Sequence, residues 1–146
     1  TKNKRSVNYM AFESFEIDLF SSKSLFEIIE TYHIDIVLNC VGLTNVEACE
    51  RNPNDAYRLN SQLPGKIAMV CNSTNTKLIH ISTDHFFDDQ DILHSEEEKV
   101  NLLNVYAKSK YQGEIEVKTP YDNCVLIMPS RRQRPGDTAV RFGKYI

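Results

Sequence analysis

A tyrosine and a lysine stand four residues apart, at Tyr106 and Lys110, in a stretch whose pattern predicts a helix. On a helix this spacing places both side chains on one face, about one turn apart. An ammonium group beside a phenol favours loss of the phenol proton, so such a pair could exchange a proton with a carbonyl or an alcohol near neutral pH. An isolated Tyr-x-x-x-Lys is more often a solvated surface pair. Whether this pair is catalytic therefore depends on the motifs that precede it in the chain.

Two hydroxyls and a carboxylate follow a short apolar run upstream of this pair. Residues 77–81 read Lys-Leu-Ile-His-Ile, and Ser82, Thr83 and Asp84 come next. Such a run is typical of a buried parallel strand that delivers polar side chains to the carboxyl edge of a sheet, where open α/β sheets place their chemistry. The order of strand, Ser-Thr-Asp, acidic loop and Tyr/Lys helix indicates redox chemistry between a carbonyl and an alcohol.

Alternating apolar runs and amphipathic segments supply the elements that would position these residues. The run at 35–41 is continuous and ends at a glycine, which is typical of a parallel strand buried on both faces. Alternation of strand and helix predicts an α/β fold, Rossmann-like, with a doubly wound parallel sheet and right-handed crossovers. Helices are predicted over 24–30, 53–71 and 105–118, and further strands over 7–12 and 123–128.

Composition limits the functions open to the chain. Its 146 residues carry a formal net charge of -3, which argues against a general nucleic-acid binder, because that role needs a basic surface. No apolar run approaches the ~20 residues that span a bilayer, and the N-terminus lacks the apolar core of a signal peptide, so we expect no membrane partner and a cytoplasmic protein. The cysteines form no C-x-x-C pair, so no metal site is predicted. The acidic residues 96–98 indicate a solvated loop, with a divalent-ion site as the alternative.

These ordered motifs resemble the extended short-chain dehydrogenase/reductase superfamily, and within it dTDP-4-dehydrorhamnose reductase and related sugar-nucleotide reductases. The resemblance covers about residues 15–128. The motifs that carry it are Asp18-Leu19, Asn-Cys-Val-Gly-Leu-Thr at 39–44, Asn60, His-Ile-Ser-Thr-Asp-His-Phe-Phe at 80–87, Leu-Asn-Val-Tyr at 103–106 running on to Lys110, and Gly113-Glu114.

The resemblance implies NAD(P)H-dependent reduction of a 4-keto nucleotide sugar in the synthesis of surface-polysaccharide sugars. Tyr106 would protonate the sugar carbonyl, Lys110 would assist it and bind the nicotinamide ribose, and Thr83 would hold the carbonyl oxygen. NADP or NAD would be the cofactor, a nucleotide sugar would be the substrate, and a homodimer is possible. The residues expected to line the cofactor are Asp18, Leu19, Val41, Gly42, Thr44, Asn60, Ser82, Tyr106 and Lys110.

The chain departs from the family at both ends. The family opens with a strand and a Gly-x-x-Gly-x-x-Gly turn that holds the pyrophosphate, and both are lacking here, since the first glycine is Gly42. Residues 1–128 are therefore predicted to form a partial dinucleotide-binding domain. Residues 129–146 are predicted to be a tail, which could be the remnant of a substrate-binding part. Arg-Pro-Gly-Asp-Thr at 134–138 resembles a stretch near the C-terminus of these reductases, with an ordinary polar tail as the alternative.

A second function fits the same motifs. The regulatory subunit of methionine adenosyltransferase also resembles this family, so the chain could belong to a non-catalytic protein that binds a dinucleotide or a partner. The presence of Thr83, Tyr106 and Lys110 together favours the enzyme, because a pure binding protein does not need all three.

Overall fold

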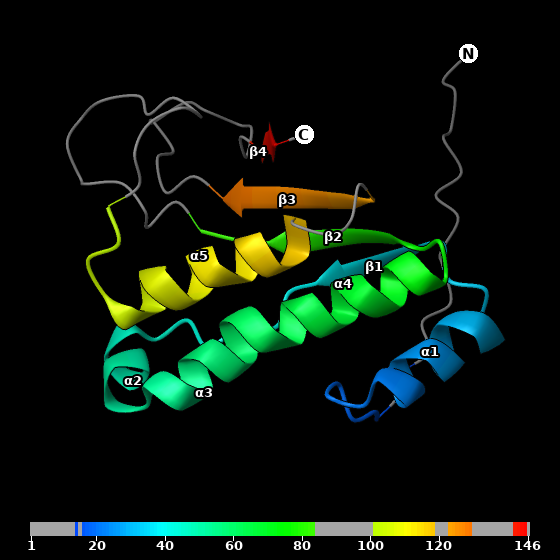
Figure 1. Cartoon of the computed structure of the whole chain (residues 1–146), viewed down its shortest axis with the longest axis horizontal. Coiled ribbons are helices and arrows are strands. Elements are labelled where there is room, and N and C mark those ends of the chain that lie inside the picture. The colour runs from blue at the N-terminus through cyan, green and yellow to red at the C-terminus, as the bar shows by residue number, and fades with distance from the viewer. Residues whose placement is uncertain (1–13, 15, 84–100, 119–122, 130–141, 146) are drawn as a thin grey trace, which may run out of the picture.

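The computed structural model describes residue 14 and residues 16–83, 101–118, 123–129 and 142–145. These residues build a four-stranded sheet in the order β1-β2-β3-β4, with helices packed against it (Figure 1). The first three strands run parallel, and β4 runs antiparallel to β3. The strands are β1 (Ile36–Asn39), β2 (Lys77–Ile81), β3 (Cys124–Pro129) and β4 (Phe142–Tyr145).

The predicted helices are present, and polar side chains cap several of them. Ser21 Oγ accepts a hydrogen bond from Ser24 N, and Asn104 Oδ1 accepts one from Ala107 N, so both side chains act as N-caps. Asn45 caps a further short helix in the same way. The helices are α1 (Ser22–Thr31), α2 (Val46–Arg51), α3 (Pro53–Tyr57), the π-helix η1 (Arg58–Gln62), α4 (Leu63–Ser73) and α5 (Val105–Lys118).

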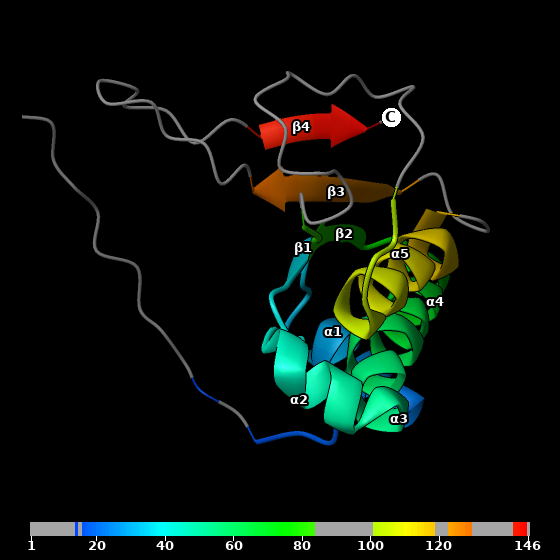
Figure 2. The ribbon, with the colours of Figure 1, turned by 90° about the vertical axis from the view of Figure 1, so that its left-hand side faces the viewer.

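Helices α1, α4 and α5 lie on the same side of the sheet (Figures 1 and 2). The topology dictates this for α4 and α5, because β1, β2 and β3 follow one another in one direction, and right-handed crossovers then place both connecting helices on one face. This arrangement confirms the Rossmann-like α/β fold, of which the described residues build one helical layer. The core between sheet and helices consists of Leu25, Ile29, Leu63, Ile67, Ala68, Val70, Cys71, Leu78, Val117 and Leu126.

Strand β1 is the edge of the described sheet, and only one of its faces is covered. Val37 packs toward the core and Asn39 is buried, whereas Ile36 and Leu38 are 55% and 57% exposed. The prediction of a strand buried on both faces is therefore wrong for the described residues. The physical reason is that the described helices all lie on the face of the sheet toward which Val37 packs, which leaves the side chains of Ile36 and Leu38 largely exposed.

Helix η1 crosses α5 at very close range. A Cβ built on Gly113 would lie 2.0 Å from the carbonyl oxygen of Asn60, so no larger residue fits there. The π-helix lies in an otherwise continuous helical stretch from α3 to α4, and Pro64 stands in the first turn of α4. π-Helical turns of this kind often occur at functional sites.

Strand β4 lies in the segment that the sequence analysis predicted to be a tail outside the domain. It pairs with β3, Met128 with Gly143 and Ile127 with Lys144, so it belongs to the same sheet. The predicted strand at 7–12, the Asp84 carboxylate, the acidic loop at 96–98 and the stretch at 134–138 lie outside the described residues.

Candidate active site

The carboxyl end of β2 carries two buried hydroxyl residues. Ser82 and Thr83 are 4% and 6% exposed, and Ser82 N donates to Ile127 O at 2.8 Å, which extends the pairing of β2 with β3. Helix α5 packs across this strand end. Lys110 Nζ donates to the carbonyl oxygen of Ile81 at 2.6 Å, so the lysine predicted from spacing alone does reach the strand predicted to carry the chemistry.

Tyr106 and Lys110 are buried, although a Tyr-x-x-x-Lys pair on a surface helix would be solvated. They are 8% and 4% exposed. Tyr106 packs in a small cluster with Cys49 and Ala56, against which Leu43 also packs. The tyrosine is thereby held next to the loop after β1, and the lysine next to the end of β2.

Asn60 clamps the loop after β1 to helix α5. Its Oδ1 accepts from Leu43 N at 2.7 Å, and its Nδ2 donates to Leu43 O and to Ser109 Oγ, each at 3.0 Å. Ser109 Oγ in turn donates to Tyr106 O at 2.9 Å. Asn60 is fully buried, and its side-chain hydrogen bonds hold the loop after β1 against α5. The clamp leaves room only for glycine at position 42, since a Cβ there would lie 2.9 Å from Asn60 Oδ1.

A second buried amide fixes the start of the same loop. Asn39 Oδ1 accepts from Val41 N at 3.0 Å, and its Nδ2 therefore faces His80 Nδ1 at 3.1 Å and donates to it. The neutral imidazole then carries its proton on Nε2, which has no hydrogen-bond partner among the described residues. Burial, and next the charge of Lys110, lower the pKa of His80 to about 3, so the ring is neutral near pH 7.

Lys110 is a buried ammonium next to a buried acid. Burial lowers the pKa of Lys110 to about 8, and the charge of Glu114 opposes this change. Burial also raises the pKa of the Glu114 carboxyl, against the opposing effects of the Ser82 hydroxyl, Lys118 and Lys110. The lysine can therefore change its charge within the range in which enzymes work.

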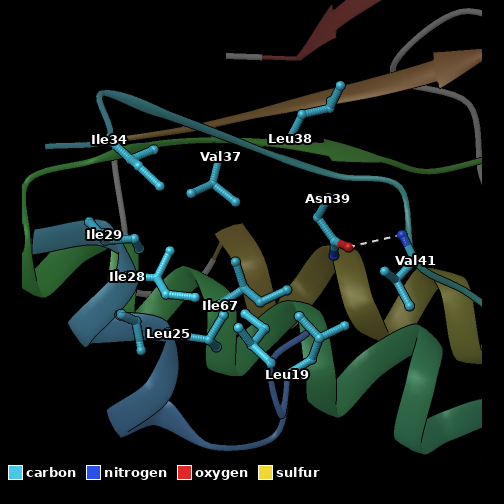
Figure 3. Close-up of a pocket in the computed structure, with 12 residues that line it drawn as sticks. Leu19, Leu25, Ile28, Ile29, Ile34, Val37, Leu38, Asn39, Val41 and Ile67 are labelled. Carbon is cyan, nitrogen blue, oxygen red and sulfur yellow. Dashed lines mark hydrogen bonds between the residues drawn. The ribbon is translucent and has the colours of Figure 1, made fainter. Parts of the chain in front are cut away.

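An apolar pocket lies beside β1, between the chain before α1 and the loop after β1 (Figure 3). Leu19 and Val41, which the sequence analysis assigned to the cofactor, both line it. Figure 3 also shows the hydrogen bond from Val41 N to Asn39 at the pocket's polar end. The next residue, Gly42, leads toward Lys110, because a Cβ built on it would lie 3.9 Å from Lys110 Nζ. One loop thus connects an apolar pocket with a buried ammonium.

The family model described as the RmlD substrate binding domain matches residues 1–130, and thus most of the chain. The chain belongs to this family. A probable low-salt glycan biosynthesis reductase, Agl14, of Haloferax volcanii is 34% identical over 113 residues, which are 77% of this chain and 38% of that protein. Subunit beta of bovine (Bos taurus) methionine adenosyltransferase 2 is 29% identical over 99 residues, 68% of this chain and 30% of its own length.

Solved structures agree with this RmlD-family assignment. The crystal structure of dTDP-4-dehydrorhamnose reductase from Bacillus anthracis in complex with NADP superposes with a TM-score of 0.71 at 25% identity. The match covers 77% of this chain and 40% of that one. The chain thus spans less than half the length of the relatives that it matches.

The structure places several of the residues predicted for the RmlD-family site at one edge of the sheet. Lys110 binds the carbonyl oxygen of Ile81, the residue before Ser82, and a Cβ built on Gly42 would lie 2.9 Å from Asn60 Oδ1 and 3.9 Å from Lys110 Nζ. Asp18 and Thr44 are exposed, and the Asp18 carboxylate caps a local turn by accepting from Phe20 N at 2.9 Å.

The sequence analysis counted Asn39, His80 and Glu114 among the family motifs, but it assigned no role in the site to them or to Ser109. Only Glu114 gave a usable signal, since it follows Lys110 at the same four-residue spacing that picked out the Tyr106–Lys110 pair.

The residues that the structure describes contain neither a candidate metal centre nor a membrane-spanning helix. Within these ranges no group of three or more His, Cys, Asp or Glu side chains could hold a metal ion. No helix in the same ranges is long and apolar enough to cross a membrane.

Proposed function

We propose that this chain provides the catalytic acid and part of the dinucleotide site of a cytoplasmic, NADPH- or NADH-dependent reductase that acts on a 4-keto nucleotide sugar. The observation that carries the proposal is the burial of Lys110 against the end of β2, on the helix that also holds Tyr106. The named activities of the relatives, a glycan biosynthesis reductase and dTDP-4-dehydrorhamnose reductase, support it. We also place the family among the extended short-chain dehydrogenases, in which a homodimer is possible.

The residues present fit part of a nicotinamide dinucleotide. A flat purine ring suits the apolar pocket that Leu19 and Val41 line, with the exposed Asp18 carboxylate nearby in sequence for a ribose hydroxyl. Gly42 lets the loop backbone approach a ligand closely, as sites for dinucleotides require. Lys110 would donate hydrogen bonds to the hydroxyls of the second ribose.

The chain's own residues would handle the proton and the carbonyl oxygen. When bound, a reduced nicotinamide would supply a hydride to the carbonyl carbon. Tyr106 would give its phenol proton to the carbonyl oxygen, and the ammonium of Lys110 would stabilise the negative charge left on the phenol. Thr83 would donate a hydrogen bond to the same oxygen and hold it in place. Because these groups are buried, their electrostatic effects are stronger than in water.

The test is steady-state oxidation of NADPH and of NADH by the full-length protein with dTDP-4-dehydrorhamnose, monitored at the nicotinamide absorbance. We expect turnover with at least one of the two cofactors, and formation of the 4-hydroxy sugar nucleotide detected by mass spectrometry. Absence of turnover with either cofactor, for a folded protein that binds the dinucleotide, would contradict the reductase assignment.

The match to methionine adenosyltransferase 2 subunit beta supports a second candidate, a dinucleotide-binding or partner-binding protein without turnover. The same assay separates the two candidates. A protein that binds NADPH with micromolar affinity by calorimetry, yet oxidises none of it in the presence of sugar nucleotide, would favour the binding protein.

A further inference from the structure

Glu114 is a buried carboxylate that the proposed reaction does not use. It lies on α5 four residues beyond Lys110, and it is 7% exposed. One of its oxygens accepts a hydrogen bond from Ser82 Oγ, and the other lies 3.8 Å from Lys118 Nζ. Burying an ionised carboxylate costs free energy unless hydrogen bonds and opposite charges compensate for the lost water, so a glutamate at this position calls for a specific role.

Lys110 and Glu114 hold successive residues at the end of β2. Lys110 Nζ binds the carbonyl oxygen of Ile81, and the Glu114 carboxylate binds the hydroxyl of the next residue, Ser82. Because side chains at i and i+4 project from the same face of a helix, one stripe of α5 fixes the strand end that carries Thr83. An apolar side chain at position 114 would remove both the acceptor of Ser82 and a negative charge near Lys110.

Among the described residues, the charged and titratable groups that interact with Lys110 and Glu114 come from α5 and β2. Lys110 faces Glu114 on its own helix and His80 on β2, and the imidazole is neutral near pH 7. Glu114 faces Ser82 on β2, and Lys110 and Lys118 on its own helix. Lys118 is about half exposed at its side chain, so water screens its charge. Glu114 is therefore the buried counter-charge of Lys110 among these groups.

We infer that Glu114 is a positioning residue of the reductase site, which orients Ser82 at the end of β2 and keeps Lys110 in its charged form. This inference rests on the proposed function, since it assigns Glu114 to the same site. Glu114 would touch neither the carbonyl nor the cofactor, and would act through Ser82 and Lys110.

The test compares three variants of the full-length protein. Glu114→Gln keeps the size of the side chain and an oxygen for Ser82 but removes the charge. Glu114→Asp keeps the charge on a shorter side chain that no longer reaches Ser82. Glu116→Gln is the matched control, because Glu116 is an exposed acid on the same helix that pairs with Gln112 at 3.0 Å. For each protein the pH profile of kcat/KM, the melting temperature and the titration of Lys110 are measured. The Lys110 titration is followed by NMR of ¹⁵N-lysine side chains and assigned with Lys110→Arg.

We expect Glu114→Gln to move the alkaline limb of kcat/KM, and the Lys110 titration midpoint, to lower pH by about one pH unit. The sign follows from charge: without the carboxylate, the ammonium loses its proton at lower pH. At pH 8 kcat/KM should fall roughly fivefold, because the protonated fraction of Lys110 drops from about one half to about one tenth. Glu114→Asp should lower kcat while it leaves the limb near its original position, and Glu116→Gln should match the parent protein.

A lower melting temperature for Glu114→Gln with an unchanged limb and an unchanged Lys110 midpoint would overturn the inference, because Glu114 would then only stabilise the fold. Should Glu114→Gln fail to fold, Glu114→Asp decides: parent-like kcat at every pH would overturn the positioning role. If the parent protein reduces no sugar nucleotide, the proposed function fails separately. The Lys110 titration then still tests the link between Glu114 and Lys110, and an unmoved midpoint refutes it.

Discussion

The polar edge at the end of β2 and the apolar pocket beside β1 meet at the loop of residues 41–44, and they are built in different ways. At the polar edge, buried Asn60, Ser109, Lys110 and Glu114 each have named hydrogen-bond or charge partners. The pocket is lined by aliphatic side chains, with Asn39 as its polar member. A polar site depends on each partner's position, whereas an apolar pocket depends mainly on size and shape. Substitutions should therefore be costly at the polar edge and milder around the pocket. They should be mildest at the exposed residues of β1, Ile36 and Leu38.

The largest effect should come from Tyr106→Phe, which removes the proposed acid and keeps the ring that packs against Cys49 and Ala56. We expect turnover of the full-length protein to fall roughly 10³-fold, as is typical when a general acid is lost. Dinucleotide binding should change less than about threefold, because the ring still fills its place. Steady-state kinetics and calorimetric titration measure the two quantities. Turnover near that of the parent protein would remove Tyr106 from the mechanism.

Lys110→Ala should differ from Tyr106→Phe by damaging both turnover and binding, because it removes the ammonium that serves the phenol and a hydrogen-bond donor for the ribose. The two variants are therefore best measured side by side. Binding that is equally intact in both would argue against the ribose contact.

Gly113→Ala should destabilise the fold by about 3 kcal/mol or more, because the new methyl group would lie 2.0 Å from the Asn60 carbonyl oxygen. Gly65→Ala on α4 is the matched control. Its methyl would lie 3.1 Å from Glu116 Cβ, a tight contact that a small shift of α4 against α5 can relieve, and the gain in helix propensity of up to about 1 kcal/mol offsets part of that cost. Urea denaturation measures both. A Gly113→Ala protein as stable as the Gly65→Ala protein would mean that η1 and α5 do not cross this closely.

The elements of the fold were predictable from local sequence, and the polar edge was predictable only in part. Caps at Ser21 and Asn104 and the apolar run of β2 are short-range signals, and the structure contains each of them. The exposure of Ile36 and Leu38 on β1 was not predictable, because it depends on which face the described helices cover. The π-helix η1 was missed for a similar reason, since its sequence reads as an ordinary helix.

The residues of the candidate site likewise fall into those with a local sequence signal and those without one. Spacing identified Tyr106 and Lys110, and position after a strand identified Thr83. The contacts of Glu114 with Ser82, and of Asn39 with His80, join residues 32 and 41 positions apart in the chain. Such contacts arise from packing of one element on another, and a single sequence carries no local signal for them.

His80 lies between the two regions, and its titration should make the stability of the fold depend on pH. The pKa of His80 is lowered from 6.5 to about 3 in the folded protein. As the pH falls, the unfolded chain therefore takes up a proton on this residue at a higher pH than the folded protein does. The stability present above pH 6.5 should therefore fall as the pH drops toward 3, by up to about 1.4 kcal/mol per pH unit from this residue. Urea denaturation between pH 7.5 and 5 measures the slope. His80→Gln, which cannot titrate, should have a flatter slope, and equal slopes would contradict the assignment.

The smallest effect should occur at Leu38, on the exposed side of β1. Leu38→Thr in the 146-residue chain should cost less than about 1 kcal/mol, because more than half of the leucine surface is already in water and threonine suits a strand. Leu78→Ala on the neighbouring strand is the contrasting variant. Leu78 is 2% exposed within the core, so its truncation should cost about 2–5 kcal/mol. Urea denaturation of both variants gives the difference directly. A cost at Leu38 equal to that at Leu78 would mean that the outer face of β1 is covered in solution, and the contrast between the two regions would then lie in their chemistry alone.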